Sequence, residues 1–180
     1  MHILLIILLI LGAIIALVLI LAAASPSDWE IEAAIVIDKP KADVYDYVKI
    51  LKNSENFNKW VMTDPGMKKE FKGTDGTVGC VYCWDSENKQ VGKGEQEILK
   101  LSQGQRIDYE IRFYKPFEGT SYASILFDAL SDKQTKVRWT FSSSNTYMMK
   151  VMHVALNLKK MLQKDLQTSL VNLKRVLENN

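Results

Sequence analysis

The clearest residue pattern with chemical potential is the pair Cys80 and Cys83, which are separated by two residues. A Cys-x-x-Cys pair on a loop or helix can bind zinc or carry out thiol redox chemistry. Here the pair lies in a stretch that alternates like a β-strand, in which residues three apart point to opposite faces. The chain has no second cysteine pair and only two histidines, His2 and His153. We therefore expect neither a metal site nor a redox site.

The remaining ionisable candidates are one histidine and a group of carboxylates. His153 could serve as a general base, but the helical pattern places it on a polar face with Lys150 and Asn157, so we expect it to be solvated. Four acids alternate with arginines in predicted strands and are expected to form surface charge pairs, while one turned inward would suit an enzyme. No nucleophile elbow or phosphate-binding glycine loop is present, and we predict no catalytic residue. The acids are Glu95, Glu97, Asp108 and Glu110, and the arginines are Arg106, Arg112 and Arg138.

A set of aromatic residues and methionines is more informative. Flexible methionines often line sites that accept varied apolar shapes, and indole or hydroxyl donors orient the guest. Plain core packing explains any single member equally well, but the set predicts a cavity with apolar walls. The segment 115–119 is expected to form a lip at its entrance. The predicted lining consists of Trp60, Tyr82, Trp84, Tyr109, Phe113, Trp139, Met148, Met149 and Met152.

The elements that must position these residues follow one order. A strand is expected over 29–37, then a helix that begins near Pro40 and a second short helix through residues 57–61. About six more strands follow, separated by turn signals, with a bulge expected at residues 92–94. From about residue 145 the period becomes helical, and some 30 residues of helix would be about 45 Å long. This order predicts an α+β domain in which a curved antiparallel sheet of about seven strands surrounds a long C-terminal helix.

The N-terminus carries a different kind of segment. Residues 3–24 hold no charged or polar side chain, and as a helix they would reach roughly the 30 Å of a bilayer's hydrocarbon core. We predict one transmembrane anchor over residues 1–24, a linker over 25–28 and a single domain over 29–180. A cleaved signal peptide is the alternative, since three alanines precede Ser25 and Pro26, although the apolar run is long and lacks a preceding Lys or Arg.

Charge and length limit the remaining functions. The chain has 180 residues and a formal net charge of +2, with acids and bases interspersed, so we expect no nucleic-acid partner.

The orientation of the domain relative to the membrane is not fixed by charge. The lysines that follow the apolar run belong to the folded domain, where the positive-inside rule weakens. The membrane face of the domain therefore stays open.

Several local sequences resemble the START-like superfamily, also called SRPBCC or polyketide cyclase/dehydrase and lipid-transport proteins. The resemblance covers residues 29–178 and looks closest to bacterial members with one N-terminal membrane helix, which implies a single-pass protein of the bacterial inner membrane. It also implies the helix-grip fold with a central cavity, and it carries over no catalytic residue. The matching segments are 32–45 (EAAIVIDKPKADVY), Trp60, 79–86, 92–98, 106–109 and 170–174.

These observations lead to one functional hypothesis and two alternatives. We expect a membrane-anchored binder or carrier of a lipid-like or other apolar small molecule, without a cofactor and with residues 3–24 in the membrane. A cyclase, dehydratase or hydrolase that uses the same cavity is the first alternative. A chaperone-like protein-interaction module with a collapsed cavity is the second. The sequence identifies no protein partner.

Overall fold

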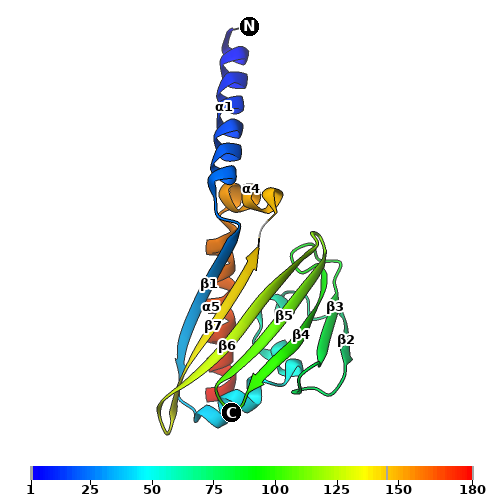
Figure 1. The fold of residues 1–180 in the computed structure, drawn as a ribbon, viewed down its shortest axis with the longest axis vertical. Coiled ribbons are helices and arrows are strands. Elements are labelled where there is room, and N and C mark those ends of the chain that lie inside the picture. The colour runs from blue at the N-terminus through cyan, green and yellow to red at the C-terminus, as the bar shows by residue number, and fades with distance from the viewer. Residues whose placement is uncertain (1, 145, 180) are drawn as a thin grey trace.

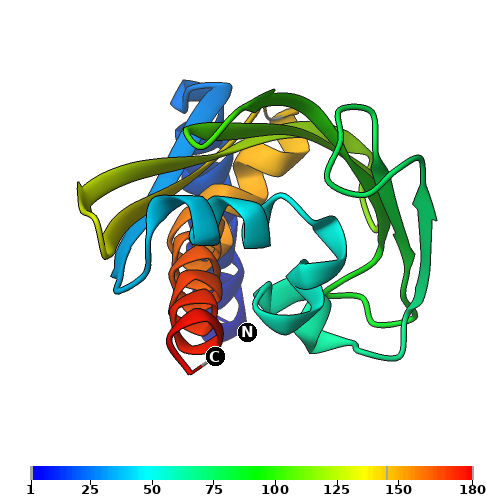
Figure 2. The same ribbon diagram turned by 90° about the horizontal axis from the view of Figure 1, so that it is seen from below.

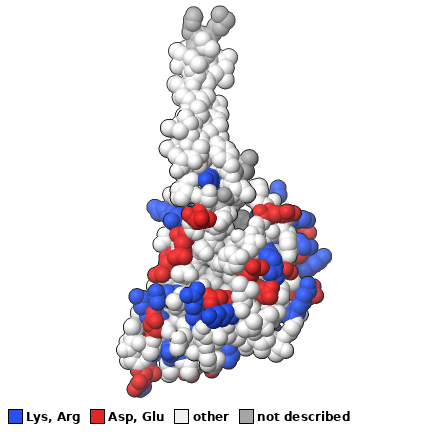
Figure 3. Space-filling model, viewed as in Figure 1, with Lys and Arg blue, Asp and Glu red and all other residues white. Residues whose placement is uncertain are grey.

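The molecule consists of one long apolar helix attached to a single α+β domain (Figure 1). The computed structural model describes residues 2–144 and 146–179, together with the side chains of all of these except residues 2 and 148. Acidic and basic side chains are interspersed over the domain, whereas the apolar helix carries none (Figure 3). The helices are α1 (His2–Ala24), α2 (Lys41–Val48), the 3₁₀ helix η1 (Leu51–Asn56), α3 (Lys59–Thr63), α4 (Tyr147–Leu156) and α5 (Leu158–Glu178).

Seven antiparallel strands form one sheet in the order β1-β7-β6-β5-β4-β3-β2, which confirms the predicted fold. Alternation of apolar and polar residues fixes the register, because a slip by one residue would turn every apolar side chain to solvent. Ala33, for example, lies opposite Trp139, and Ile125 lies opposite the same tryptophan on the other side. The strands are β1 (Asp28–Ile37), β2 (Lys68–Lys72), β3 (Val81–Asp85), β4 (Lys93–Ser102), β5 (Arg106–Lys115), β6 (Gly119–Ser131) and β7 (Gln134–Ser144).

Helix α5 covers only one side of the concave face of this sheet. Its leucines at positions 166, 170, 173 and 177 are buried, as the helical stripe predicts. Among the described residues, α5 packs mainly on β1 and makes a smaller contact with β7, and α2 makes small contacts with β6 and β7. Figure 2 shows the sheet curving away from α5 toward β3 and β2. Within the part of the chain that the structure describes, contacts of the helices with β3, β4 and β5 are few, and side chains line this part of the concave face.

The C-terminal segment differs from the prediction of one continuous helix. It breaks at Asn157, which adopts left-handed backbone angles (φ 50°, ψ 44°) between α4 and α5. Asparagine tolerates this conformation better than most residues, and the backbone N–H groups of Lys160 and Met161 donate to its carbonyl oxygen to begin α5. The apolar stripe continues at helical spacing across the break, so the pattern of residues gave no sign of it.

Helix α4 turns away from the sheet and packs against the end of α1. Val18 is half-buried and Ala22, one turn later, is fully buried, whereas the other described side chains of α1 are exposed. Two hydrogen bonds fix the junction. The Tyr147 hydroxyl donates to the Leu19 carbonyl oxygen (3.0 Å), and Lys150 Nζ donates to the Ser25 carbonyl oxygen (2.8 Å). The stretch Ile3–Ala24 is long and apolar enough to span a membrane.

His153 is not solvated, which corrects the sequence expectation. Because α4 folds over the start of β1, the imidazole lies 4.7 Å from the Trp29 ring, centroid to centroid, and its Nε2 atom is buried without a hydrogen-bond partner. Burial, together with the positive charge of Lys159, lowers the pKa of His153 below its usual value. The neutral imidazole therefore belongs to the packed junction.

The bulge predicted at residues 92–94 is confirmed and yields a stability test. The register of β4 and β5 shifts between Lys93 and Gly94. A Cβ atom on Gly94 would lie 2.5 Å from the Arg112 carbonyl oxygen and 2.6 Å from the Trp84 ring. We expect Gly94→Ala to lower the free energy of unfolding by about 1–3 kcal/mol in denaturant titrations.

Gly119 supplies the matched control, because Gly94 and Gly119 both pair with Phe113 from neighbouring strands and Gly119 has open space where a Cβ would be. Gly119→Ala should change the free energy of unfolding by no more than about 0.5 kcal/mol. Equal losses in the two variants would contradict the close packing of Trp84 on Gly94.

The titration of His153 tests the junction between α4 and β1. With His2 replaced in a His2→Gln variant, the single remaining imidazole should titrate below 6.5 in an NMR pH series. The folded pKa is depressed, so this group's contribution to stability is complete above about pH 6.5 and is lost as the pH falls through the folded pKa. A midpoint at or above 6.5 would show that His153 faces water.

Candidate functional site

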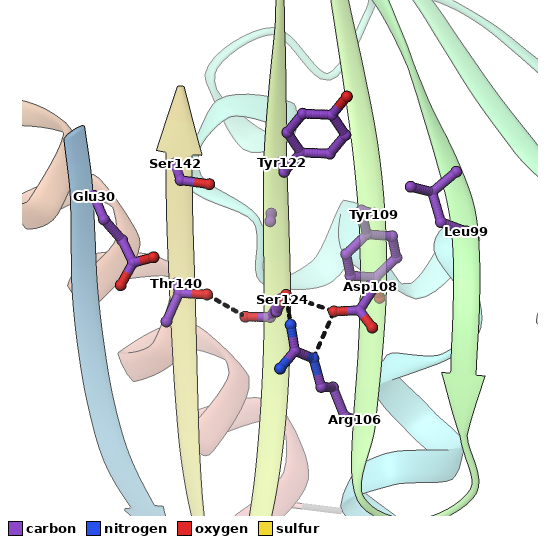
Figure 4. A pocket seen from close by; sticks show the side chains of 10 residues that line it. Glu30, Leu99, Arg106, Asp108, Tyr109, Tyr122, Ser124, Thr140 and Ser142 are labelled. Carbon is purple, nitrogen blue, oxygen red and sulfur yellow. Dashed lines mark hydrogen bonds and ion pairs between the residues drawn. The ribbon is translucent and has the colours of Figure 1, made fainter. Parts of the chain in front are cut away.

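The first hollow, of about 290 Å³, lies on the outer face of the sheet (Figure 4). Arg106 donates to Asp108 (2.6 Å) and to Ser124 (2.9 Å), and the Ser124 hydroxyl donates to Asp108 (2.6 Å). These three side chains therefore satisfy one another across β5 and β6. A network whose donors and acceptors are already paired supports the sheet and offers little to a ligand.

The second hollow, of about 470 Å³, lies on the outer face of β2, β3 and β4. At its border, Arg112 binds three carboxylates: Glu95 (2.6 Å), Glu97 (2.8 Å) and Glu110. These contacts confirm the predicted cross-strand charge pairs on the outer face. None of these three acids is available as an inward-facing acid or base.

The cysteines lie on opposite sides of the sheet, as the strand pattern predicts. Cys80 is buried in the core, whereas the Cys83 thiol lies within 3.6 Å of a Glu95 oxygen on the outer face. Within residues 2–144 and 146–179, no group of three or more His, Cys, Asp or Glu side chains is placed to hold a metal ion. The two thiols therefore cannot act on one metal or on each other.

The concave face of β3, β4 and β5 collects most of the predicted aromatic residues. The Trp84 ring lies across Gly94, its centroid 6.1 Å from Phe113 in an edge-on contact and 6.1 Å from Tyr82. Phe71 of β2 extends this wall, with its centroid 4.9 Å from that of Tyr82. The Trp84 indole donates to the Val91 carbonyl oxygen (3.3 Å), which fixes the orientation of the ring. We call Phe71, Tyr82, Trp84 and Phe113 the aromatic wall.

Several hydrogen-bonding atoms inside the domain have no partner among residues 2–144 and 146–179. The Tyr82 hydroxyl and Trp139 Nε1 are buried and make no hydrogen bond within this part of the chain, and the same holds for the Tyr45 hydroxyl. Burial, with a smaller contribution from Glu55, raises the pKa of Tyr82 far above its ordinary value, and burial likewise raises the pKa of Tyr109. These phenols therefore stay protonated and can donate hydrogen bonds at any physiological pH.

The aromatic wall is more exposed toward the end of the sheet that adjoins α4. Tyr82 and Tyr109 are buried, whereas Trp84 and Phe113, which lie nearer that end, are only partly buried. The β5–β6 turn lies at the same end of the sheet as α1 and α4 (Figure 1). Its Phe117 is 49% exposed. The segment 115–119, predicted to form a lip, makes up this turn and the residues that flank it.

An ion pair beside the aromatic wall is among those that the sequence did not predict. Lys69, opposite Trp84 in the register of β2 and β3, shares the concave side with that ring. Its Nζ atom lies 3.3 Å from Glu55 of η1, and the two side chains are 18% and 33% exposed. Because the partners are separated along the chain and lie in different elements, neither residue carries a local signal of this contact.

Not every predicted lining residue joins this wall. Trp139 lies on β7, with its ring centroid 6.3 Å from that of Phe57, and Trp60 of α3 is partly buried against the core. Met149 and Met152 belong to α4, which packs mainly on α1 and touches the sheet at the start of β1. The side chain of Met148 lies outside the described residues. The break at Asn157 is the reason that these methionines lie apart from the aromatic wall.

Comparison with solved structures gives the same fold at low sequence identity. Protein MLL2253 from Mesorhizobium loti aligns with a TM-score of 0.62 at 14% identity, covering 84% of this chain and 98% of that chain. Truncated norcoclaurine synthase from Thalictrum flavum also aligns at 0.62, with 10% identity and coverages of 85% and 95%. Protein CV1439 from Chromobacterium violaceum aligns at 0.57, with 18% identity and coverages of 83% and 96%.

The comparison with sequence patterns of known families shows to which family the chain belongs. No curated protein sequence matches the chain closely. The sequence pattern of the family described as "Polyketide cyclase / dehydrase and lipid transport" matches residues 28–178, which include every strand and the whole of α5. This match covers far more than half of the chain and agrees with the helix-grip arrangement of sheet and helix. The chain therefore belongs to the polyketide cyclase/dehydrase and lipid transport family.

Proposed function

We propose that this protein is a membrane-anchored binding protein or carrier for an apolar, lipid-like small molecule. The guest occupies the concave side of β3, β4 and β5, against the aromatic wall. The single observation that carries the proposal is the presence of unpaired donors, the Tyr82 hydroxyl and Trp139 Nε1, among apolar side chains. A buried polar atom without a partner costs about 1–3 kcal/mol, and a guest with an acceptor oxygen would remove that cost.

Three further observations support a guest of this chemistry. Apolar walls with a few convergent donors are the usual composition of a small-molecule site. The aromatic wall supplies flat apolar surface, and partial exposure of Trp84 and Phe113 provides a way in. The family description includes lipid transport. The expected guest is mostly hydrocarbon or ring, with at least one hydrogen-bond acceptor.

We further propose that α1 is an uncleaved single-pass membrane anchor. Its length and apolar composition permit a span, and a signal sequence passes the same test. The contacts with α4 favour retention, because cleavage after Ala24 would expose the surface that covers Ala22 and remove the bond from Tyr147 to Leu19. An apolar guest leaves water unfavourably, at about 0.8 kcal/mol per buried CH₂, so a tethered carrier shortens its aqueous path.

Replacement of Tyr82 by Phe tests the binding proposal through two opposite effects. Removal of the unpaired hydroxyl should raise the free energy of unfolding of the ligand-free full chain by about 1 kcal/mol. The same change should weaken binding of an anthroyloxy-stearate probe, measured by fluorescence titration in detergent, by about 3–10-fold, since the probe loses one donor.

Tyr122→Phe is the matched control, because Tyr122 lies on the outer face and is 50% exposed. It should alter neither stability nor probe affinity. If the probe does not bind the wild-type chain, or binds both variants equally well, the proposed position of the guest is wrong.

A cavity enzyme is the second candidate, because Glu55 and Lys69 place two ionisable groups beside the aromatic wall. One structural neighbour is a synthase, truncated norcoclaurine synthase, so the fold can host catalysis in at least one case. Glu55→Gln separates the two functions. A binding protein keeps its affinity for the probe in this variant, whereas an enzyme that uses this carboxylate would bind its substrate and turn it over at least about 100-fold more slowly.

A further inference from the structure

We infer that α4 is an interfacial helix that lies in the membrane surface and holds the open end of the sheet against the bilayer. This inference rests on the proposed anchor, but it assigns a separate contact to a separate element. The partner that α4 contacts is the surface of a lipid bilayer. Three features of α4 support this contact: its composition, its exposure and its level along α1.

Helix α4 is too apolar to lie exposed to water. Lys150 and His153 are its only ionisable residues other than the phenol of Tyr147, and the remaining seven are Met, Val, Ala and Leu. Both ionisable side chains are engaged at the junction, by a bond to the Ser25 carbonyl oxygen and by packing on Trp29. Leu156 is 61% exposed and Tyr147 50% exposed, and the described side chains of the central residues are only half-buried. A helix that is apolar on nearly every side requires an apolar neighbour.

The level of α4 along α1 identifies that neighbour. A span of the roughly 30 Å hydrocarbon core needs about 20 residues, so α1 must use its sequence from Ile3 to about Ala22. Leu19, which accepts the hydrogen bond from Tyr147, and Ala22, which α4 helps to bury, both lie within this stretch. The residues from Ile3 to Val18 alone would reach only about 24 Å. The bilayer boundary therefore falls at the level of α4.

The direction of α4 also agrees with a position in the membrane surface. It runs across the axis of α1 at the base of that helix (Figure 1), so a vertical α1 leaves α4 parallel to the membrane surface. Tyrosine is enriched at such boundaries, because its ring is apolar and its hydroxyl is polar. The β5–β6 turn, which carries the exposed Phe117, lies at the same end of the domain as α4 (Figure 1). In this orientation the partly exposed rings of Trp84 and Phe113 lie toward the end of the domain nearest the lipid.

Nitroxide depth measurements on the full chain in phosphatidylcholine nanodiscs test this inference. Single cysteines in a Cys80→Ala, Cys83→Ser parent carry the label at Leu156 of α4, at Ile10 of α1 or at Leu130 near the β6–β7 turn. Leu130 is the matched control, since it is 54% exposed and lies at the far end of the sheet. We expect collisions with oxygen to dominate at Leu156→Cys and Ile10→Cys, and collisions with a water-soluble nickel complex to dominate at Leu130→Cys.

The three labels separate the two possible failures. A lipid-exposed label at position 10 with a water-exposed label at 156 would overturn the interfacial helix and leave the anchor intact. A water-exposed label at position 10 would overturn the anchor and this inference with it. If the cysteine-free parent does not fold, Leu156→Trp and Leu130→Trp in the native background replace the labels. Brominated lipid should then quench the added fluorescence of the first variant and not of the second.

Discussion

A seven-stranded sheet with one apolar face presents more surface than a single helix can cover, and this mismatch determines the rest of the structure. Helix α5 is about 10 Å across with its side chains. Its buried leucines therefore cover β1 and part of β7, and other elements must cover the remaining strands. Short elements, α2, η1 and α3, enclose part of the remainder. Large aromatic side chains line what is left. The concave side of β3, β4 and β5 is therefore the natural place for a guest.

The position of the glycines shows how this face is shaped. Gly94 provides no side chain where the Trp84 ring packs, and the register of β4 and β5 shifts beside it, as at a β-bulge. Polar atoms that stay unpaired in such a place are unusual in a purely structural core, where nearly all buried donors find partners. Tyr82 and Trp139 depart from that rule, and departures of this kind concentrate at functional sites.

Much of the fold could be predicted from alternation and helical period, because both reflect local geometry. Ile107, Tyr109 and Ile111 of β5 point inward as expected, and the residues between them carry the predicted charge pairs. The break at Asn157 could not be predicted, since the apolar stripe crosses it without interruption. That one residue moves Met149 and Met152 to the junction with α1 and brings His153 onto Trp29. The contact between Glu55 and Lys69 was also hidden, because it depends on how η1 packs against the sheet.

The anchor and the sheet act together in this account. The bonds from Tyr147 and Lys150 tie α4 to the end of α1, so the domain does not hang on the linker alone. The open end of the sheet lies on the side of the domain that adjoins this junction. With α1 in the bilayer and the guest on the concave face, as proposed, the path of a lipid-soluble guest through water would be short.

Native mass spectrometry of the full chain, released from membranes with a mild detergent, measures the central claim most directly. The account predicts a population that carries the added mass of one apolar small molecule, and this population should shrink in the Tyr82→Phe variant and persist in Tyr122→Phe. A chain that stays bare after extraction and after incubation with an excess of extracted membrane lipids would contradict a guest on the concave face.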